Sequence, residues 1–329
     1  MSPADQPGQE PQSTGSVLMV RPATFACNPQ TAASNAFQQL PTPLADPGLQ
    51  GAAMREFDGL ANALARAGVE VLIAPDSNEP PKPDAIFPNN WVSFHRDGTV
   101  ALYPMLAPNR RAERRDEILE FVVREGAFRV SRTVDLTHRE AEEKFLEGTG
   151  SVVLDRTNRV AYACSSPRTD LDVLGEFAQQ LDYELMTFDA ADGRGRAIYH
   201  TNVLMAIGSG FAVICGDSIA NASHRTAVFS KLRGDGHEIV DISLEQMAQF
   251  AGNVLELATA TATGATTAAT ASAGRIIALS TTALDSLSPA QRGILESHAA
   301  LVPVAIPTIE RVGGGGVRCM LAEIHLPKR

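Results

Sequence analysis

The chain has 329 residues, of which 44% are hydrophobic and 20% charged, as in a globular protein that buries a sizeable core. Its net charge of -10 is the wrong sign for binding nucleic acid phosphates or an anionic membrane, so neither partner is expected. No run approaches the roughly 18 apolar residues of a membrane span. Four scattered cysteines without a CxxC pair favour reduced thiols in the cytoplasm, and the absence of phosphate, dinucleotide and zinc motifs predicts no metal or other cofactor.

The first 15 residues are polar and rich in proline, which predicts a disordered tail (residues 1–15) before a single domain (residues 16–329). Apolar residues at helical spacing then predict a series of helices along the chain. They cover residues 54–68, 111–125, 170–181, 223–234 and 288–298. The Ala/Thr-rich run at residues 258–274 has low complexity and predicts a surface loop.

A pattern of polar or Gly-rich residues, an apolar strand, a turn and a second strand recurs along the chain. The first strands are predicted to begin near residues 91, 151, 203, 254 and 319. A helix and a short strand follow the hairpins, so that the repeating unit is ββαβ. The last unit, residues 313–326, has no second strand, and the apolar strand at residues 16–22 has no first. The two ends of the chain are therefore expected to complete one hairpin together.

Repeated ββαβ units around one core favour an α/β ring in which the polar blocks converge on the axis. In an open α/β sheet, which is the alternative, the same polar residues form ordinary turns. The ring has a chemical consequence, because it brings together side chains that are far apart in the sequence.

Cys319 follows four glycines and an arginine in the last unit. Glycines allow several backbone N–H groups to turn toward one point, where they stabilise an anion such as a thiolate. His200 and Glu147 stand at positions that the repeat predicts to be equivalent in two other units. In the ring, a nucleophile, a proton carrier and an orienting carboxylate therefore meet at the axis. An isolated cysteine is more often a buried structural residue, which is the interpretation for the cysteines on apolar strands.

Further polar side chains in these blocks are candidates for binding a substrate. Asparagines precede several first strands in the same way, although turn capping is an equal alternative for them. Arginines after second strands suit a substrate carboxylate, which a guanidinium grips through two hydrogen bonds, and the backbone before Cys319 suits an oxyanion. The candidates are Asp84, Asn89, Asn90, Asn202, Arg110, Arg111, Arg168 and Arg318, with Asn253 completing the set of asparagines.

These motifs resemble the amidinotransferase, arginine deiminase and dimethylarginine dimethylaminohydrolase superfamily, from about residue 17 to residue 326. The resemblance rests on residues 84–91, 147–151, 200–202 and 313–319. It implies a five-bladed α/β propeller, the pentein fold, with Cys319 as covalent nucleophile, His200 as general acid and base, and Glu147 as the carboxylate bonded to substrate and histidine. It also implies a small amino-acid substrate, citrulline or an arginine derivative, whose α-carboxylate is bound by arginines.

Two departures from the superfamily's usual pattern bear on the substrate. This chain has Asn90 where guanidino-acting members carry a carboxylate, and Asn202 where arginine deiminases have an aspartate. Carboxylates compensate the charge of a buried guanidinium, whereas an amide both donates to and accepts from a neutral ureido group. Because the motifs look most like the citrulline-hydrolysing branch, the predicted reaction converts L-citrulline to ornithine, ammonia and carbon dioxide.

Two alternatives remain at the level of the sequence. Within the superfamily, the alternative is a guanidino hydrolase of the arginine deiminase or dimethylarginine dimethylaminohydrolase type. The second alternative is a non-catalytic pentein binding protein, like the related ribosome anti-association factors. Such a protein does not need a set of cysteine, histidine and glutamate. The sequence leaves the oligomeric state open, a homodimer included.

Overall fold

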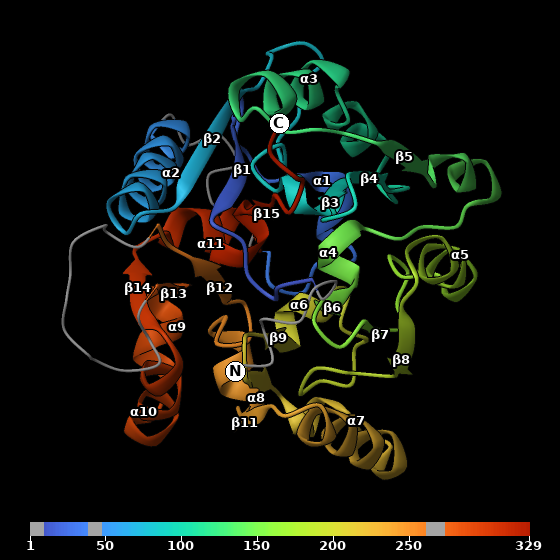
Figure 1. The fold of residues 1–329 in the computed structure, drawn as a ribbon, viewed down its shortest axis with the longest axis vertical. Helices are drawn as coiled ribbons and strands as arrows, with labels where there is room; N and C mark the ends of the chain where they lie inside the picture. The colour runs from blue at the N-terminus through green and yellow to red at the C-terminus, as the bar shows by residue number, and fades with distance from the viewer. Residues whose placement is uncertain (1–9, 39–47, 261–273) are drawn as a thin grey trace.

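The computed structural model describes residues 10–38, 48–260 and 274–329. These residues form three-stranded sheets that are arranged as five blades around a central axis (Figure 1). In each blade the first strand runs antiparallel to the second, and the third runs parallel to the second on its other side. This topology confirms the predicted ring of ββαβ units, the five-bladed α/β propeller, and excludes one open sheet.

The strands correspond to the predicted apolar runs. The first blade contains β3 (Val92–Phe94), β4 (Thr99–Leu102) and β5 (Arg132–Asp135), and the second contains β6 (Val153–Asp155), β7 (Val160–Cys164) and β8 (Glu184–Phe188). The third blade contains β9 (Met205–Ile207), β10 (Phe211–Ile214) and β11 (Glu238–Asp241), and the fourth contains β12 (Leu255–Ala258), β13 (Arg275–Ser280) and β14 (Ala300–Val304). The fifth blade is β15 (Ala322–Glu323), β1 (Ser16–Arg21) and β2 (Glu70–Pro75). Because Val17 pairs with Glu323, the predicted closure of the ring by both ends of the chain is confirmed.

A long helix connects the second and third strands of each blade and lies on the rim of the ring (Figure 1). These helices are α2 (Leu49–Arg66), α3 (Asp116–Glu125), α5 (Leu171–Leu181), α7 (Ala222–Gly234) and α10 (Pro289–His298). They confirm the predicted helices with two differences. The first helix begins before residue 54, and the helix predicted over residues 111–125 is divided into the 3-10 helix η3 (Pro108–Glu113) and α3, because Arg114 and Arg115 take extended conformations.

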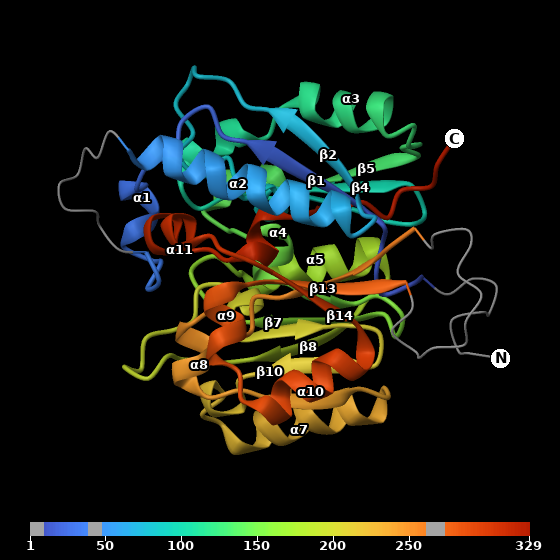
Figure 2. The same cartoon turned by 90° about the vertical axis from the view of Figure 1, so that its left-hand side faces the viewer.

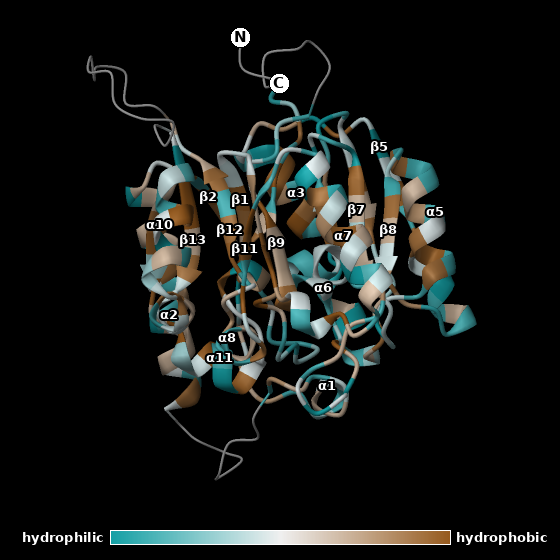
Figure 3. Cartoon of the chain, turned by 90° about the horizontal axis from the view of Figure 1, so that it is seen from below, coloured by the Kyte–Doolittle hydropathy of each residue, from teal (hydrophilic) through white to brown (hydrophobic). Residues whose placement is uncertain are grey.

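Local sequence explains where these helices lie and end. Helix α2 buries Phe57, Leu60 and Leu64 at helical spacing, and Gly68 follows it with a φ of +90° that favours glycine. Helix α10 begins with a capping box in which Ser288 and Gln291 satisfy each other's backbone N–H groups. Hydrophobic residues are concentrated in the strands and on the helix surfaces that face them (Figure 3).

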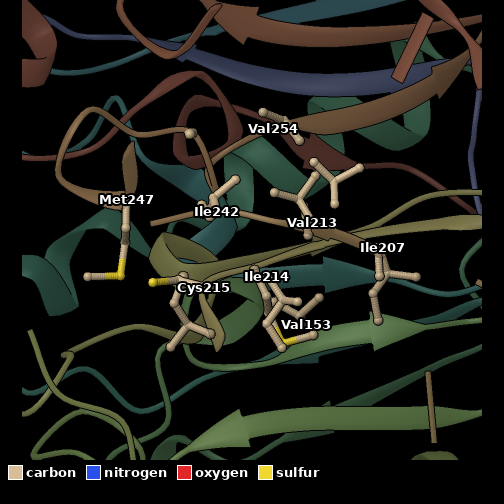
Figure 4. Close-up of a cluster of buried hydrophobic side chains, with 14 of the residues drawn as sticks. Val153, Ile207, Val213, Ile214, Cys215, Ile242, Met247 and Val254 are labelled. Carbon is tan, nitrogen blue, oxygen red and sulfur yellow. The ribbon is translucent and has the colours of Figure 1, made fainter. Parts of the chain in front are cut away.

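The core fills the space between adjacent blades. One cluster joins side chains of β6, β9, β10 and the fourth blade, among them Val153, Ile207, Val213 and Val254 (Figure 4). Cys164 and Cys215 belong to the same buried cluster, and burial raises the pKa of each thiol to about 11. Both cysteines are therefore structural, as their positions on apolar strands predicted.

The predicted disordered tail is wrong for residues 10–15, whereas its first nine residues lie outside the described residues. Glu10 is buried, with one carboxylate oxygen 2.9 Å from Arg156 and the other 2.9 Å from Arg159. Gln12 is also buried and donates to the carbonyls of Leu154 and Ile207. Specific partners thus order a segment whose composition alone indicates disorder. The predicted loop at residues 258–274 lies mostly outside the described residues, since 261–273 are not among them.

The remaining short elements lie in the segments between the strands, either within a blade or between two blades. Helices α1 (Pro29–Ala32) and α11 (Pro307–Gly313) lie on the side opposite the C-terminus (Figure 2). The others are α8 (Leu244–Ala248), α9 (Thr281–Ser286), η4 (Thr137–Glu142) and η5 (Gly216–Ser218). Among the helices of the described residues, none has the length and apolar character required to cross a bilayer.

Candidate active site

Short helical turns carry the polar blocks that precede the first strands: η2 (Pro88–Asn90), α4 (Gly148–Ser151), α6 (Thr201–Leu204) and η6 (Val317–Met320). Turn α4 contacts both η2 and α6, and η2 contacts η6. Only glycine fits at Gly150, because a Cβ there would lie 2.4 Å from Asn90 Nδ2 and 2.8 Å from His200 Nδ1. Close packing of the turns therefore brings polar side chains of different blades together.

A small cavity opens beside these turns. Its walls come from several blades and from the segment around α1. The candidate residues that line it are Asp84, Asn90, Arg110, Arg168, His200 and Cys319. Glu147 and Asn202 do not line the cavity but contact residues that do.

Cys319 is buried in η6, with amide groups around its sulfur. Asn253 Nδ2 lies 3.3 Å and Asn202 Nδ2 3.6 Å from Cys319 Sγ. Burial raises the pKa of the thiol, while the hydrogen bond from Asn253 and the charge of Arg318 oppose that shift. The neutral thiol is therefore favoured, beside donors that would stabilise the thiolate.

His200 and Glu147 form a buried pair in which His200 Nε2 lies 2.9 Å from Glu147 Oε2. Burial disfavours the ionised form of Glu147, but the charge of Arg168 and the bond to His200 outweigh it, so the pKa of Glu147 is well below its usual value. Burial lowers the pKa of His200 to about 4 despite its bond to Glu147. Since an ionised carboxylate only accepts hydrogen bonds, His200 carries its proton on Nε2 and keeps Nδ1 as the basic nitrogen.

Two buried arginines lie close to the carboxylate of this pair. Arg168 Nη1 donates to Glu147 Oε2 at 3.2 Å, and its remaining donors contact Ser34 Oγ and the carbonyl of Thr31. Arg110 Nη1 lies 3.8 Å from the same carboxylate oxygen. Asp84 accepts from Asn28 through Oδ2, whereas its buried Oδ1 has no hydrogen-bond partner among the described residues.

Most of the chain matches a known protein family. The family described as N,N dimethylarginine dimethylhydrolase, eukaryotic, matches residues 21–326. The chain belongs to this dimethylarginine dimethylhydrolase family. It is accordingly an enzyme that hydrolyses carbon–nitrogen bonds. The alternative of a non-catalytic pentein binding protein is therefore rejected. No curated protein sequence matches the chain.

Solved structures with the same fold cover nearly the whole of this family member. One is the N-terminal domain of ArgZ, an arginine dihydrolase from the ornithine-ammonia cycle in cyanobacteria, as a cysteine-to-serine mutant bound to substrate, with 17% identity, a TM-score of 0.69 and coverage of 95% of this chain and 99% of that chain. A cysteine-to-alanine mutant of AgrE with L-arginine has 18% identity and a TM-score of 0.70, and the match covers 95% of this chain and 40% of that chain. A histidine-to-glycine variant of dimethylarginine dimethylaminohydrolase, as an adduct with S-methyl-L-thiocitrulline, has 13% identity, a TM-score of 0.61 and coverage of 95% and 100%.

Besides Glu147, Asn202 and Asn253, three further candidate residues lie outside the cavity of this dimethylarginine dimethylhydrolase family member. Arg111 is partly exposed, donates to the Met105 carbonyl and pairs with Glu140, because the tight turn of η3 directs only Arg110 inward. The Arg318 side chain is bonded to Glu323 and its N–H to Asn253, so neither faces the cavity. Asn89 is fully buried and does not line the cavity, and its side chain has no hydrogen-bond partner in the part of the chain that the structure describes.

The predicted equivalence of the three catalytic candidates within the repeat is also wrong. Cys319 lies three residues before β15 begins at Ala322, whereas His200 lies five before β9 and Glu147 six before β6. Asn202, three residues before β9, is the counterpart of Cys319. The last strand is also shorter than predicted, since Cys319 lies in a 3-10 turn rather than at the head of a strand.

Sequence reasoning missed the cavity wall that follows β1. Asn35 Nδ2 donates to the carbonyls of Gly313 and Gly314, and Thr31 lines the cavity beside Asp84. Tyr199 also lines it and donates to the Gly314 carbonyl at 2.7 Å. The one local indication was Asn28 followed by proline, a typical helix start that predicts an ordered turn there.

Proposed function

We propose that this protein hydrolyses the ureido group of L-citrulline, giving ornithine, ammonia and carbon dioxide, with Cys319 as the nucleophile. The observation that carries the proposal is the fixed polarity of the amides around the nucleophile and His200. Arg110 has donors only and binds Asn90 Oδ1 at 2.9 Å, so the Asn90 amide presents the donor Nδ2, which has no partner among the described residues. Asn253 is fixed in the same way, because Arg318 N–H donates to its Oδ1 and its Nδ2 donates to the Asn202 carbonyl.

A ureido group matches these fixed donors better than a guanidinium does. Its carbonyl oxygen accepts hydrogen bonds, and its N–H groups donate to an acceptor on the cavity wall such as His200 Nδ1. A guanidinium has donors only, so Asn90 Nδ2 would face another donor. Leaving a buried donor unmatched costs about 1–3 kcal/mol, which is roughly a ten- to hundredfold preference.

The proposed reaction has two stages. The Cys319 proton moves to His200 Nδ1, the sulfur attacks the ureido carbon, and amide donors stabilise the oxyanion. His200 returns the proton to the departing nitrogen, which releases ornithine and leaves a carbamoyl thioester on Cys319. A water molecule that gives its proton to His200 then attacks the thioester and releases carbamate, which decays to ammonia and carbon dioxide. Ionised Glu147 stabilises the imidazolium in both stages.

The cavity also indicates how the amino-acid end of the substrate binds. Arg168 binds Ser34 with two of its donors, and a substrate carboxylate can replace that neutral hydroxyl with a charged acceptor. Asp84 Oδ1, which has no partner among the residues that the structure describes, is an acceptor for the α-ammonium. We therefore assign the α-carboxylate to Arg168 rather than to Arg110, whose partner is the carboxylate of Glu113.

A guanidino substrate, arginine or dimethylarginine, is the second candidate. The free, buried oxygen of Asp84 supports it, because a carboxylate compensates a buried cation. The family description and the arginine-bound AgrE structure point the same way.

One experiment separates the two candidates. The purified protein is incubated with L-citrulline, L-arginine or dimethylarginine, and ornithine, citrulline and dimethylamine are quantified, with Cys319→Ser as the inactive control. Ornithine formed from citrulline supports the proposal. Citrulline as the end product from either guanidino substrate, with no turnover of added citrulline, overturns it.

A further inference from the structure

Arg110 belongs to a buried ion pair that the proposed reaction does not use. Its Nε donates to Glu113 Oε1 and its Nη2 to Glu113 Oε2, both at 2.9 Å. The two residues are three apart in η3, where the side chains at i and i+3 lie directly above one another. Both are 2% exposed, so the pair is protected from water. A two-point pair of this kind fixes the plane of the guanidinium.

The second edge of that guanidinium reaches the cavity. Arg110 Nη1 donates to Asn90 Oδ1 at 2.9 Å, and Nη2 also lies 3.4 Å from the Phe87 carbonyl. Two other carboxylates compete for the same cation at longer range, with Asp84 Oδ2 at 3.7 Å from Nε and Glu147 Oε2 at 3.8 Å from Nη1. Glu113 is the carboxylate that keeps Arg110 turned toward Asn90 instead of toward these two.

We propose that Glu113 is a positioning residue that determines substrate selectivity, because it fixes the polarity of the Asn90 amide through Arg110. This inference rests on the proposed function, in which the donor end of Asn90 distinguishes a ureido from a guanidinium group. Glu113 itself does not line the cavity. Its influence passes through two hydrogen-bonded side chains, Arg110 and Asn90, to the cavity wall.

The expected consequence of losing the Glu113 charge follows from these distances. In a Glu113→Gln variant, Arg110 keeps one neutral acceptor at position 113 and is drawn toward Asp84 and Glu147. Asn90 Oδ1 then loses its donor, so the amide is free to turn and present its oxygen to the cavity. An oxygen there accepts from a guanidinium and repels a ureido oxygen, so discrimination in favour of citrulline decreases.

The matched control is Glu140→Gln. Glu140 also accepts two hydrogen bonds from one arginine, with Arg114 Nη1 bonded to Oε1 at 2.6 Å and Nη2 to Oε2 at 3.1 Å. Neither Glu140 nor Arg114 lines the cavity. Removing this carboxylate therefore disrupts a similar pair on the same stretch of chain without releasing Asn90.

The measured quantity is kcat/KM for citrulline divided by kcat/KM for arginine. We expect the Glu113→Gln variant to lower this ratio by about tenfold, the equivalent of one hydrogen bond, and the Glu140→Gln variant to leave it within about twofold of the wild type. Equal ratios in the two variants, or an unchanged ratio in Glu113→Gln, overturn the inference. If Glu113→Gln does not fold, Glu113→Asp replaces it; this variant keeps the charge but is one methylene shorter, and a smaller decrease of about threefold is expected.

A double variant separates positioning from general damage. In an Asn90→Asp background the side chain has no donor end to orient, so adding Glu113→Gln should not change the ratio further. An effect of equal size in both backgrounds overturns the inference. Wild-type turnover of citrulline tests the proposed function separately. If arginine proves to be the substrate, that proposal fails, and the dependence of the Glu113→Gln effect on Asn90 is measured on arginine alone.

Discussion

Asn253 offers a sharp test of how the site stabilises a thiolate. Its Nδ2 is the closest amide donor to Cys319 Sγ, at 3.3 Å, and its other contacts fix it in place. An Asn253→Ala substitution removes that donor and leaves Asn202 Nδ2, at the longer distance of 3.6 Å, as the other amide donor near the sulfur. We expect the pKa of Cys319, which burial already raises, to rise further.

The size of the expected pKa shift follows from the strength of the hydrogen bond between Asn253 and the thiolate. A hydrogen bond to a charged group contributes about 1.5–3 kcal/mol, which corresponds to roughly one to two pKa units. At a pH below the pKa, the thiolate fraction and the rate of alkylation then fall about ten- to a hundredfold. The substitution also frees the Arg318 N–H and the Asn202 carbonyl, at a cost of about 1–3 kcal/mol each in the free energy of unfolding.

The assay is iodoacetamide labelling of Cys319 as a function of pH, followed by mass spectrometry of the peptide so that the partly exposed Cys27 does not interfere. Asn221→Ala is the control, because Asn221 caps α7 on the surface and its loss costs about 1 kcal/mol of stability without touching the cavity. A labelling profile of Asn253→Ala that superimposes on the wild type, in a protein that is destabilised, refutes the assigned role. An equal shift in Asn221→Ala also refutes it, since loss of stability alone would then account for the change.

Three further outcomes are expected. Cys319→Ser should lower turnover by at least about 10⁴-fold and abolish the covalent carbamoyl adduct seen by mass spectrometry in the wild type, and a folded variant that retains turnover contradicts the mechanism. Asn90→Asp should replace the fixed donor by an acceptor, lowering kcat/KM for citrulline by about ten- to a hundredfold relative to arginine, and steady-state kinetics on both substrates measure this. Burial lowers the pKa of His200 from 6.5 to about 4, so the unfolded chain binds more protons between these values, and the contribution of His200 to stability is complete above pH 6.5 and lost as the pH falls to 4. Relative to His200→Gln, the wild type should therefore lose roughly 3 kcal/mol of unfolding free energy over that range in urea titrations, and a difference that stays constant with pH contradicts the assignment.

The fold was predictable because its information is local and repeated. Each blade has an apolar hairpin, an amphipathic helix with its caps and a short third strand, and these patterns are read from a few neighbouring residues. Helix α10, for instance, begins at the Ser288 capping box and ends at His298, close to its predicted bounds. Closure of the fifth blade by β1 and β15 followed from counting, since each end of the chain lacked one strand.

The site was predictable only in part, because several contacts join residues that no local pattern links. Asn35 reaches Gly313 across 278 positions of sequence, and Gln12 reaches Ile207 across 195. The choice between Arg110 and Arg111 depended on the turn geometry of η3, which a helix predicted over residues 111–125 concealed. The pairing of Glu113 with Arg110 could have been predicted from the sequence, because a carboxylate follows an arginine by three residues in a turn that begins with proline.

The pKa shifts of Cys319 and His200 explain why two asparagine amides lie close to the Cys319 sulfur. Burial raises the pKa of Cys319 and lowers that of His200 to about 4, so the neutral thiol and imidazole are favoured over the thiolate and imidazolium that the proposed attack requires. Proton transfer from the thiol to the imidazole is therefore uphill in free energy. Asn253 and Asn202 reduce that cost on the sulfur side, and Glu147 reduces it on the imidazole side. Arg168 in turn holds Glu147 ionised, which makes this arginine part of the proposed acid–base machinery as well as the proposed carboxylate site.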